Sequence, residues 1–340
     1  MPSTSTRVSA PTTRADAGAA VAPASVAGVL GIDIGGTKVA LRIEPVATGT
    51  AAPVEATFQW QRAVPALRDV DDLATQVGAL LSRWAGPVGA VGVAMPGTVD
   101  AAGLVTTWPG RPSWTGLAFV DMLRALVPGA AVAHADDGDV AALAEAAAAG
   151  RSDIVYIGVG TGIGGGIVLG GRPCPGPARG SAEVGHMVIA MDGPPCTCGR
   201  RGCVQALACG PATLRRAILH RDADTTATAD GDVGFAELRA SWLDGRDWAV
   251  RAVRESAAAV AVAVTGLAEL LHPDLAVVGG GFADGLPGFT DAVAEHTQAL
   301  GRPGHPPVPV QAAVLGGLSS LAGAILLGRQ AGEGTEAADR

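Results

Sequence analysis

One histidine and three cysteines fall within 18 residues of this chain and limit how the segment can fold. His186 is followed by Cys196, Cys198 and Cys203, and two glycines among them allow sharp turns around a single ion. Imidazole and thiolate are the ligands that zinc prefers, and four of them complete a tetrahedron without room for a catalytic water. The spacing therefore predicts a structural zinc site, with buried or disulfide-bonded cysteines as the alternative.

Composition narrows the class of protein. The chain has 340 residues, of which 48% are apolar, enough for about two globular domains. No apolar run reaches the ~18 residues of a membrane span. The formal net charge is -8 and the basic residues are scattered, which disfavours a nucleic-acid surface. Cysteines clustered beside a histidine favour a reducing, cytoplasmic location over a disulfide framework, and Cys174 and Cys209 have no assigned role.

Both ends of the chain are expected to be tails. Residues 1–27 are mostly alanine, serine, threonine, proline and glycine, which cannot bury enough surface to offset their ordering entropy. They contain no continuous apolar segment of the kind found in a signal peptide, and they are too short for a DNA-binding domain. Residues 330–340 are expected to form a frayed C-terminal tail.

Buried-strand and helix patterns alternate along the chain, which is typical of α/β architecture. The expected strands cover residues 29–34, 39–43, 88–95, 154–159, 167–169 and 275–278. The expected helices cover residues 69–84, 139–149, 253–271 and 318–327. Glycine-rich loops follow strands in both halves, so we expect a ligand between two lobes.

The first glycine loop joins the first two strands. Asp33, Gly35, Gly36, Thr37 and Lys38 place a carboxylate, a hydroxyl and an ammonium around a bare turn. Backbone without side chains can approach phosphate oxygens closely, and Asp33 could hold Mg²⁺ directly or through water. An ordinary hairpin turn is the alternative.

The second glycine loop, at residues 160–166, contains the pattern G-x-G-x-x-G. A dinucleotide-binding fold would need a helix to start there, but the following residues resemble a strand and turn, so a phosphate cradle is favoured over NAD binding. A third loop after residue 278 could lie against adenine or ribose. The residues assigned to nucleotide from these two loops are Gly160, Thr161, Gly162, Gly164, Gly165, Gly280 and Gly281.

Three carboxylates precede the alanine-rich helix at residues 139–149. Asp136, Asp137 and Asp139 face the positive end of the helix dipole, and one of them is expected to cap the helix. Capping needs only one or two of the three. A further carboxylate beside two phosphate loops suggests a base that accepts a proton from a substrate hydroxyl.

These motifs, in this order, resemble the ROK family of repressors, open reading frames and sugar kinases, from about residue 28 to 328. The resemblance rests on the first loop, Pro96-Gly97, Asp137 before its helix, the second loop, Glu183-x-Gly185-His186 with the cysteines, and residues 279–281. It implies an actin-like ATPase (ribonuclease H-like) fold with a nucleotide cleft between two lobes. The small lobe would cover residues 28–133 plus a returning helix at about 315–329, and the large lobe with the zinc site would cover 134–314.

The same resemblance implies ATP, Mg²⁺ and structural Zn²⁺ as cofactors, and a homodimer or homotetramer. Asp137 would match the family's catalytic base. Glu183 and His186 would match residues that hold sugar hydroxyls, so His186 would use one ring nitrogen for zinc and the other for substrate. Gly97, Asp136 and Gln205 complete the residues assigned to the acceptor.

Three positions depart from the family's sugar kinases. Asp136 stands where they usually have asparagine, Gln205 where they have glutamate, and Pro109-Gly110-Arg111 where they often have Pro-Asn-Leu. All three positions typically touch the sugar. Exchanging an amide and a carboxylate changes which hydrogen bonds are possible, and a site built for particular hydroxyls discriminates strongly. The departures point away from glucose and toward an amino sugar or a sugar-like C7 cyclitol.

The sequence therefore predicts a kinase that moves the γ-phosphoryl group of ATP to a hydroxyl of a hexose, an amino sugar or a C7 cyclitol. Some family members in antibiotic-producing bacteria phosphorylate C7 cyclitols, and the alanine- and arginine-rich composition suits a GC-rich genome, which suggests antibiotic biosynthesis. The alternatives are a sugar-sensing transcription regulator and a sugar-binding protein without turnover.

Overall fold

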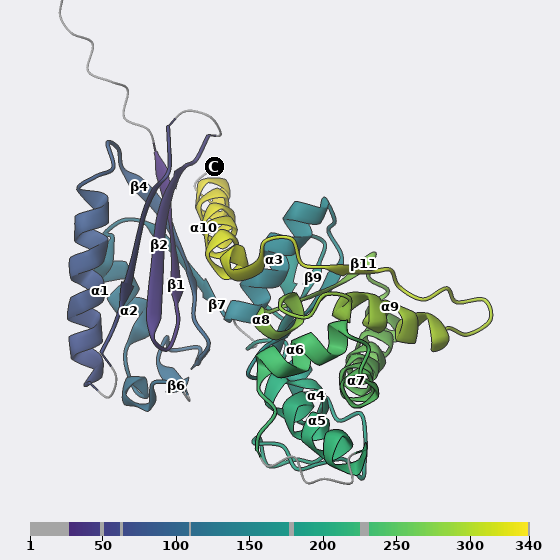
Figure 1. The fold of residues 1–340 in the computed structure, drawn as a ribbon. Coiled ribbons are helices and arrows are strands. Elements are labelled where there is room, and N and C mark those ends of the chain that lie inside the picture. Colours follow the sequence, from purple (N-terminus) through teal and green to yellow (C-terminus); the bar gives the residue numbers. More distant parts are fainter. Residues whose placement is uncertain are drawn as a thin grey trace, which may run out of the picture.

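The structure contains two five-stranded sheets that lie in two separate lobes (Figure 1). It is a computed structural model that describes residues 27–47, 51–61, 64–108, 110–176, 180–224 and 231–338. Most of the tail expected at residues 1–27 and Pro109 therefore lie outside the described residues. None of the helices in the described residues has the length and apolar character needed to cross a membrane.

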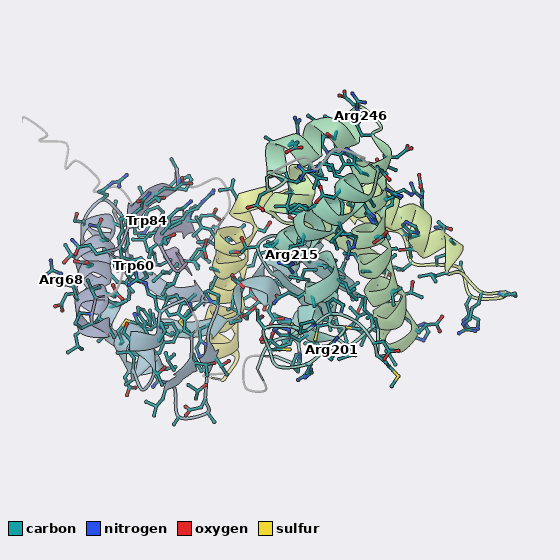
Figure 2. The ribbon with its side chains drawn as sticks, turned by 60° about the horizontal axis from the view of Figure 1, so that its bottom comes forward. Trp60, Arg68, Trp84, Arg201, Arg215 and Arg246 are labelled. Carbon is teal, nitrogen blue, oxygen red and sulfur yellow. The ribbon has the colours of Figure 1, made fainter. Side chains whose placement is uncertain are left out.

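The small lobe is built on the sheet β3-β2-β1-β4-β7, with helices packed on one face. Its elements are β1 (Gly28–Ile34), β2 (Lys38–Pro45), β3 (Val54–Gln59), α1 (Ala66–Leu81), β4 (Val88–Ala94), β5 (Thr98–Val99), β6 (Val105–Thr107), the 3₁₀ turn η1 (Pro112–Trp114), α2 (Phe119–Leu126) and β7 (Ala131–Ala135). Trp60 lies within this lobe, whereas Arg68 projects into solvent (Figure 2).

The large lobe is built on the sheet β10-β9-β8-β11-β12. Its elements are α3 (Asp137–Ala149), β8 (Ile154–Val159), β9 (Ile163–Leu169), β10 (Arg172–Cys174), η3 (Val184–His186), α4 (Val204–Ala208), α5 (Gly210–Asp224), α6 (Phe235–Leu243), α7 (Asp247–Leu271), β11 (Leu275–Gly279), α8 (Gly281–Asp284), α9 (Phe289–Ala299) and β12 (Val310–Ala312). The turn η4 (Gly316–Leu318) then leads into α10 (Ser319–Ala338).

The two sheets share one strand order. The central strands, β1 and β8, each form an antiparallel hairpin with the strand that follows in the chain, β2 or β9. On its other side each central strand pairs with a parallel strand, β4 or β11. The two glycine turns are the turns of these two hairpins. In open α/β sheets, ligands bind outside the carboxyl ends of the parallel strands. The repeated order therefore gives each lobe one glycine turn and one set of strand ends for a shared site.

Helix α10 lies between the small-lobe sheet and α3 (Figure 1). A Cβ atom on Gly92 of β4 would overlap the carbonyl oxygen of Ala324, and one on Gly323 would overlap the carbonyl oxygen of Val140. Backbone therefore contacts backbone on both sides of the helix, which requires glycine at these positions. This packing ties the end of the chain to both lobes.

The structure confirms the expected elements, with shifted ends. Strand β9 begins at Ile163, four residues before the expected strand, and α3 begins at Asp137, two residues before the expected helix. Strand β7 belongs to the small-lobe sheet and ends at Ala135, past the expected boundary at 133.

Helix α10 corrects the prediction of a frayed tail at 330–340, because it continues to Ala338. Its extra turns have tertiary contacts that the sequence pattern does not reveal. Gln330 donates a hydrogen bond to the carbonyl oxygen of Gly171 at 3.1 Å, and Gly332 lies against Ala90 of β4.

Candidate active site and metal centre

A cleft of about 830 Å³ lies between the lobes and is lined by residues of both. Pro96 and Trp108 border it on the small-lobe side, and Tyr156 and Gly158 of β8 border it on the large-lobe side. Most of the residues expected to bind nucleotide or acceptor line it. They are Gly36, Gly97, Asp136, Asp137, Gly160, Thr161, Gly162, Gly164, Gly165, Glu183, His186, Gln205 and Gly280.

Five expected nucleotide-binding residues do not line this cleft. Thr37 lines a neighbouring cavity of about 600 Å³ that also contains Gly36. Gly281 lines an adjoining cavity of about 500 Å³, together with the aromatic rings of Phe235 and Phe282 and with Gly160 and Thr161. The other three are Asp33, Gly35 and Lys38, which lie at the end of the β1–β2 hairpin.

The small-lobe glycine turn presents unpaired backbone donors. The N–H of Gly35 donates to the carbonyl of Lys38 at 2.9 Å and closes the turn. The N–H groups of Gly36 and Thr37 form no hydrogen bond within the described residues. Successive free N–H groups in a turn form a concave site for anions, so this turn can accept phosphate oxygens.

The large-lobe glycine turn is shorter than the sequence suggested. The turn comprises Gly160, Thr161 and Gly162, closed by a hydrogen bond of 2.9 Å from the N–H of Gly160 to the carbonyl of Gly162. The N–H groups of Thr161 and Gly162 make no hydrogen bond within the described residues. Strand β9 follows directly, so no helix begins here, as the sequence analysis predicted when it disfavoured NAD.

The later glycines of that segment have a packing role that the sequence analysis missed. A Cβ on Gly165 would overlap the carbonyl oxygen of Tyr156, and one on Gly166 would lie 2.6 Å from the carbonyl oxygen of Gly138. Glycine is therefore needed where the first turn of α3 rests on β9. This contact holds Asp137 at the wall of the cleft.

Asp136 and Asp137 lie at the N-terminus of α3. Asp136 caps the helix, since its Oδ1 accepts the N–H of Gly138 at 3.1 Å. Burial and the neighbouring Asp137 raise the pKa of Asp136 to about 8. Burial is also the main cause that raises the pKa of Asp137. The site therefore concentrates carboxylates where water is scarce, which favours binding of a cation or a proton.

Asp33 faces the same carboxylates from the small lobe. Burial and repulsion from Asp137 raise the pKa of Asp33 to about 6, and Lys38 offsets part of the effect. A divalent cation between Asp33 and Asp137 would relieve this repulsion, and Mg²⁺ takes one or two carboxylates and keeps several waters. The donor set therefore fits Mg²⁺.

Two of the expected acceptor residues have partners of their own. Glu183 accepts a hydrogen bond from the hydroxyl of Ser181 at 2.9 Å. Gln205 accepts the N–H of Ile163 at 3.0 Å and donates to the hydroxyl of Thr197 at 3.2 Å. Gln205 thus connects the large-lobe glycine turn to the cysteine loop. Both ends of its amide are engaged, which the sequence analysis did not foresee.

Arg111 does not line the cleft, although Gly110 beside it does. Its side chain is buried and forms an ion pair of 2.6 Å with Asp69, which is fully buried and also accepts the indole N–H of Trp114 at 2.8 Å. The Nε of Arg111 donates to the carbonyl of Gly36 at 3.1 Å. Arg111 therefore holds the backbone of the small-lobe glycine turn through the carbonyl of Gly36.

The histidine and three cysteines come together as the sequence predicted. One ligand atom from each of the four lies within 4.8 Å of the others. Cys198 Sγ is 3.7 Å from Cys203 Sγ, and Cys196 Sγ is 3.7 Å from His186 Nδ1. A tetrahedral zinc ion with ligands at ~2.3 Å separates them by about 3.8 Å. The four side chains therefore fit zinc. All five cysteines are free thiols, so none of them forms a disulfide.

His186 joins this metal cluster to the cleft. Its Nδ1 faces Cys196, and the residue also lines the cleft. A metal on Nδ1 fixes the ring and its tautomer, which leaves Nε2 to a ligand in the cleft. Burial raises the pKa of the Cys203 thiol to about 12, so a metal cation is needed to hold it as a thiolate.

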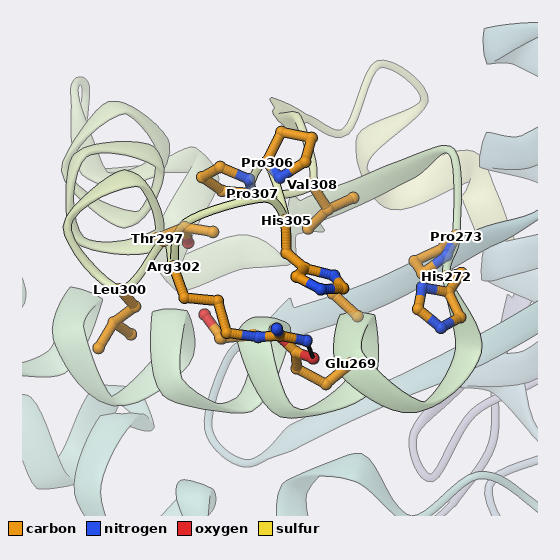
Figure 3. A pocket seen from close by; sticks show the side chains of 13 residues that line it. Glu269, His272, Pro273, Thr297, Leu300, Arg302, His305, Pro306, Pro307 and Val308 are labelled. Atoms are coloured by element: carbon orange, nitrogen blue, oxygen red, sulfur yellow. Dashed lines mark hydrogen bonds and ion pairs between the residues drawn. The ribbon is translucent and has the colours of Figure 1, made fainter.

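A second cavity, of about 230 Å³, lies in the large lobe between α7 and the segment after α9 (Figure 3). Arg302 donates to both carboxylate oxygens of Glu269, at 3.0 and 2.7 Å, so the two charges neutralise each other. His272 and His305 lie beside this pair. The cavity shares no lining residue with the cleft, and we assign it no part in the chemistry.

Comparison with known proteins places these features in a family. The model of the ROK family matches residues 29–331. A kanosamine kinase from Amycolatopsis mediterranei (strain S699) is 52% identical over 298 residues, which cover 88% of this chain and 95% of that protein.

Two solved structures are similar over most of the chain. A ROK hexokinase from Thermus thermophilus matches with a TM-score of 0.76 and 29% identity, over 92% of this chain and all of that one. A ROK family glucokinase from Streptomyces griseus, in complex with glucose and AMPPNP, matches with a TM-score of 0.69 and 30% identity, over 89% of this chain and 99% of that one. These neighbours have the two-lobed actin-like ATPase fold.

Proposed function

This chain belongs to the ROK family, and on that premise we propose that it transfers the γ-phosphoryl group of ATP to a hydroxyl of an amino sugar. The observation that carries the proposal is the position of Asp137. Its carboxylate lies in a cleft whose two glycine turns offer unpaired N–H groups from opposite lobes. The relative from Amycolatopsis mediterranei is named for kanosamine, a hexose in which an amino group replaces a hydroxyl.

The nucleotide would lie across both lobes. Its phosphates would accept the free N–H groups of Gly36 and Thr37 on one side and of Thr161 and Gly162 on the other. Its base would enter the cavity lined by Phe282, next to the third glycine loop. When bound, Mg²⁺ held by Asp33, directly or through water, would neutralise charge on the phosphates and leave Asp137 free to accept a proton.

Asp137 would act as the general base. As the acceptor oxygen attacks the γ-phosphorus, its proton passes to the Asp137 carboxylate, the new O–P bond forms, and the bond to the β-phosphate oxygen breaks to release ADP. The protein contributes mainly by positioning and by balancing charge. Closure of the lobes around α10 would exclude water and limit hydrolysis of ATP.

The acceptor would bind beside Glu183, His186 and Asp136, with Gly97 leaving room on the small-lobe side. The metal cluster would orient His186 toward the acceptor and take no part in phosphoryl transfer. We therefore assign the zinc ion a structural role. Removing it should leave the ring of His186 without a fixed orientation.

The test is ADP release with Mg-ATP and a panel of kanosamine, glucosamine, glucose, N-acetylmannosamine and a C7 cyclitol, with ³¹P NMR of the product. The kinase proposal expects turnover of an amino sugar, and a loss of about 10³-fold or more in kcat in Asp137→Asn. Asp137→Asn keeps the shape of the side chain and removes its basicity. Turnover of the wild type with an undiminished Asp137→Asn variant would remove Asp137 from the role, and no turnover of any acceptor would overturn the kinase.

A further inference from the structure

Asp136 lies at the boundary between the cleft and a small side cavity of about 30 Å³. The two spaces share Gly97, Thr98 and Asp136 in their walls. His134 and Asp139 also line the side cavity. Its volume exceeds the ~10–15 Å³ that a cavity needs to hold one water, so it can hold one small group such as an ammonium.

The carboxylates around this cavity have few partners. Asp136 uses Oδ1 to cap α3 and shares a hydrogen bond with the side chain of Asp137. Asp139, with only 2% of its surface exposed, accepts a single long hydrogen bond of 3.4 Å from the N–H of Ala182. Buried carboxylates normally accept several hydrogen bonds or face a cation. The wall of the cavity therefore has unused acceptor capacity.

Negative charge gathers here without a matching positive charge. Burial is the main cause that raises the pKa of Asp136, and repulsion from Asp137, Asp139 and Glu183 raises it further. Burial also raises the pKa of Asp139, to about 7. None of the described residues that line the cleft or the side cavity is a lysine or an arginine.

The two histidines nearby do not supply the missing charge. Burial lowers the pKa of His134, which favours its neutral form. His186 directs its Nδ1 toward Cys196 of the metal cluster and does not line the side cavity. Lys38 acts on Asp33 and lines neither the cleft nor the side cavity.

We propose that Asp136 makes the acceptor site selective for a sugar that carries a protonated amino group, and that Asp139 supports it from the wall of the side cavity. This proposal rests on the proposed function. An ammonium in the side cavity would donate to both carboxylates and supply their counter-charge. A neutral hydroxyl at the same place would leave the carboxylates uncompensated, so the site would bind it less well.

Asp136 is suited to this discrimination because asparagine would fill the same space without charge. Asparagine and aspartate cap helices about equally well, so Asp136→Asn keeps the capping bond to Gly138. It also keeps one acceptor oxygen for a hydroxyl. The variant therefore isolates the charge of Asp136, and Asp71→Asn on the exposed face of α1 is a matched control for charge removal.

The kinetic experiment compares kanosamine with glucose, which differ by an amino group in place of a hydroxyl. We expect the wild type to prefer kanosamine in kcat/KM, and Asp136→Asn to reduce that preference at least tenfold, because kcat/KM falls much more with kanosamine than with glucose. Asp71→Asn should keep the wild-type ratio. An unchanged ratio in Asp136→Asn would overturn the proposal and indicate that Asp136 binds in its protonated form, as asparagine would. If Asp136→Asn does not fold, Asp136→Ser, which also caps helices, takes its place.

A binding experiment separates this inference from the kinase proposal. Because the pKa of Asp136 is raised to about 8, its carboxyl group is protonated in the free protein at about pH 6.5. Binding of an ammonium group would ionise this carboxyl group, so its proton would be released to the solvent. Calorimetry in buffers of different ionisation enthalpy should show proton release with kanosamine, none with glucose, and none with kanosamine in Asp136→Asn. If no sugar is turned over, the kinase proposal fails, but calorimetry still tests the preference of the site for an amino sugar. Equal proton exchange on binding of kanosamine and of glucose would overturn that preference.

Discussion

The guanidinium of Arg111 lies over the ring of Trp60, 4.5 Å from the ring centroid. Each side chain also donates to a carbonyl of the small-lobe glycine turn: Trp60 Nε1 to Gly35 at 2.9 Å, and Arg111 Nε to Gly36 at 3.1 Å. Both carbonyls are thus held from behind. The N–H groups of Gly36 and Thr37 stay free for the phosphate binding that we propose, so this pair of side chains sets the geometry of the turn.

Replacing Arg111 with lysine should weaken ATP binding. Lysine has no planar fork and cannot reach Asp69, the Gly36 carbonyl and the Gln61 carbonyl together, as Arg111 does. Losing one or two hydrogen bonds at about 1 kcal/mol each corresponds to a rise of about 5–30-fold in KM for ATP. KM for the acceptor should stay within about twofold of the wild type. Steady-state kinetics with each substrate varied in turn measures both.

Trp60→Phe is the matched variant, because it keeps a ring under the guanidinium and removes only the N–H that holds Gly35. It should raise KM for ATP less than Arg111→Lys does. If Arg111→Lys lowered only the free energy of unfolding and left KM for ATP unchanged, the ion pair with Asp69 would be a structural element of the lobe alone.

Removing the metal should affect both stability and turnover. Structural zinc contributes its binding free energy to folding, and on our proposal it would also orient His186. We expect one zinc per chain in the purified protein, and a chelator should lower the melting temperature and kcat together. Cys203→Ser should abolish metal binding, whereas Cys174→Ser, outside the cluster, should keep it. Elemental analysis of each variant measures this, and a Cys203→Ser protein with full zinc content would contradict the assigned ligands.

The sequence located the metal cluster, both glycine turns and the carboxylates before α3, because each is a local pattern. Four ligands within 18 residues, or a glycine turn between two apolar runs, are visible without knowledge of the fold. The start of α3 was two residues off, since any of three adjacent carboxylates could be the cap. Only the hydrogen bond to Gly138 shows that Asp136 is the one.

The features of the site that the sequence did not predict depend on contacts between distant parts of the chain. Arg111 and Asp69 are 42 residues apart, and Gln205 and Ile163 are also 42 apart, so no spacing pattern links them. Gly165 was assigned to phosphate, but a side chain there is excluded by Tyr156 of the neighbouring strand. A sequence shows that a residue is small or polar. Which neighbour requires it becomes visible only when the sheets and helices are assembled.

Glu145 should be important for stability at the junction between the lobes. This buried carboxylate accepts the N–H groups of Val314 and Leu315 at 2.9 and 3.0 Å and the hydroxyl of Ser319 at 2.9 Å. It thereby fastens the segment that leads into α10 to α3. Glu145→Ala leaves buried donors unpaired and should lower the free energy of unfolding by about 2–4 kcal/mol.

Urea unfolding measures the effect of Glu145→Ala, with Glu333→Ala on the exposed part of α10 as the control. The control should stay within about 0.5 kcal/mol of the wild type. Equal stability of Glu145→Ala and the control would show that water replaces the carboxylate and that this junction is not held by Glu145.

Asp33 should make the free protein less stable as pH rises. Burial and repulsion from Asp137 raise the pKa of Asp33 from its ordinary value of 3.8 in an unfolded chain to about 6 in the folded protein. Between these values the folded state binds more protons than the unfolded state, so unfolding releases a proton and stability falls with increasing pH. The loss begins near pH 4 and is complete above pH 6. Below pH 4 both states are protonated and Asp33 contributes no pH dependence.

Asp33→Asn should remove this destabilisation, because asparagine carries no charge to repel Asp137. In the absence of nucleotide and Mg²⁺, the variant should match the wild type near pH 4 and exceed it at pH 8 by on the order of 1–2 kcal/mol. With Mg-ADP present, the wild type should become more stable than Asp33→Asn. Only the wild type should gain stability from Mg-ADP, because ionised Asp33 is the form that would hold the metal ion. Thermal melts of both proteins across this pH range, with and without Mg-ADP, test each part. If Asp33→Asn is no more stable than the wild type at pH 8, Lys38 already compensates the charge of Asp33. The Asp33 carboxylate would then not be an uncompensated charge available to bind a metal ion.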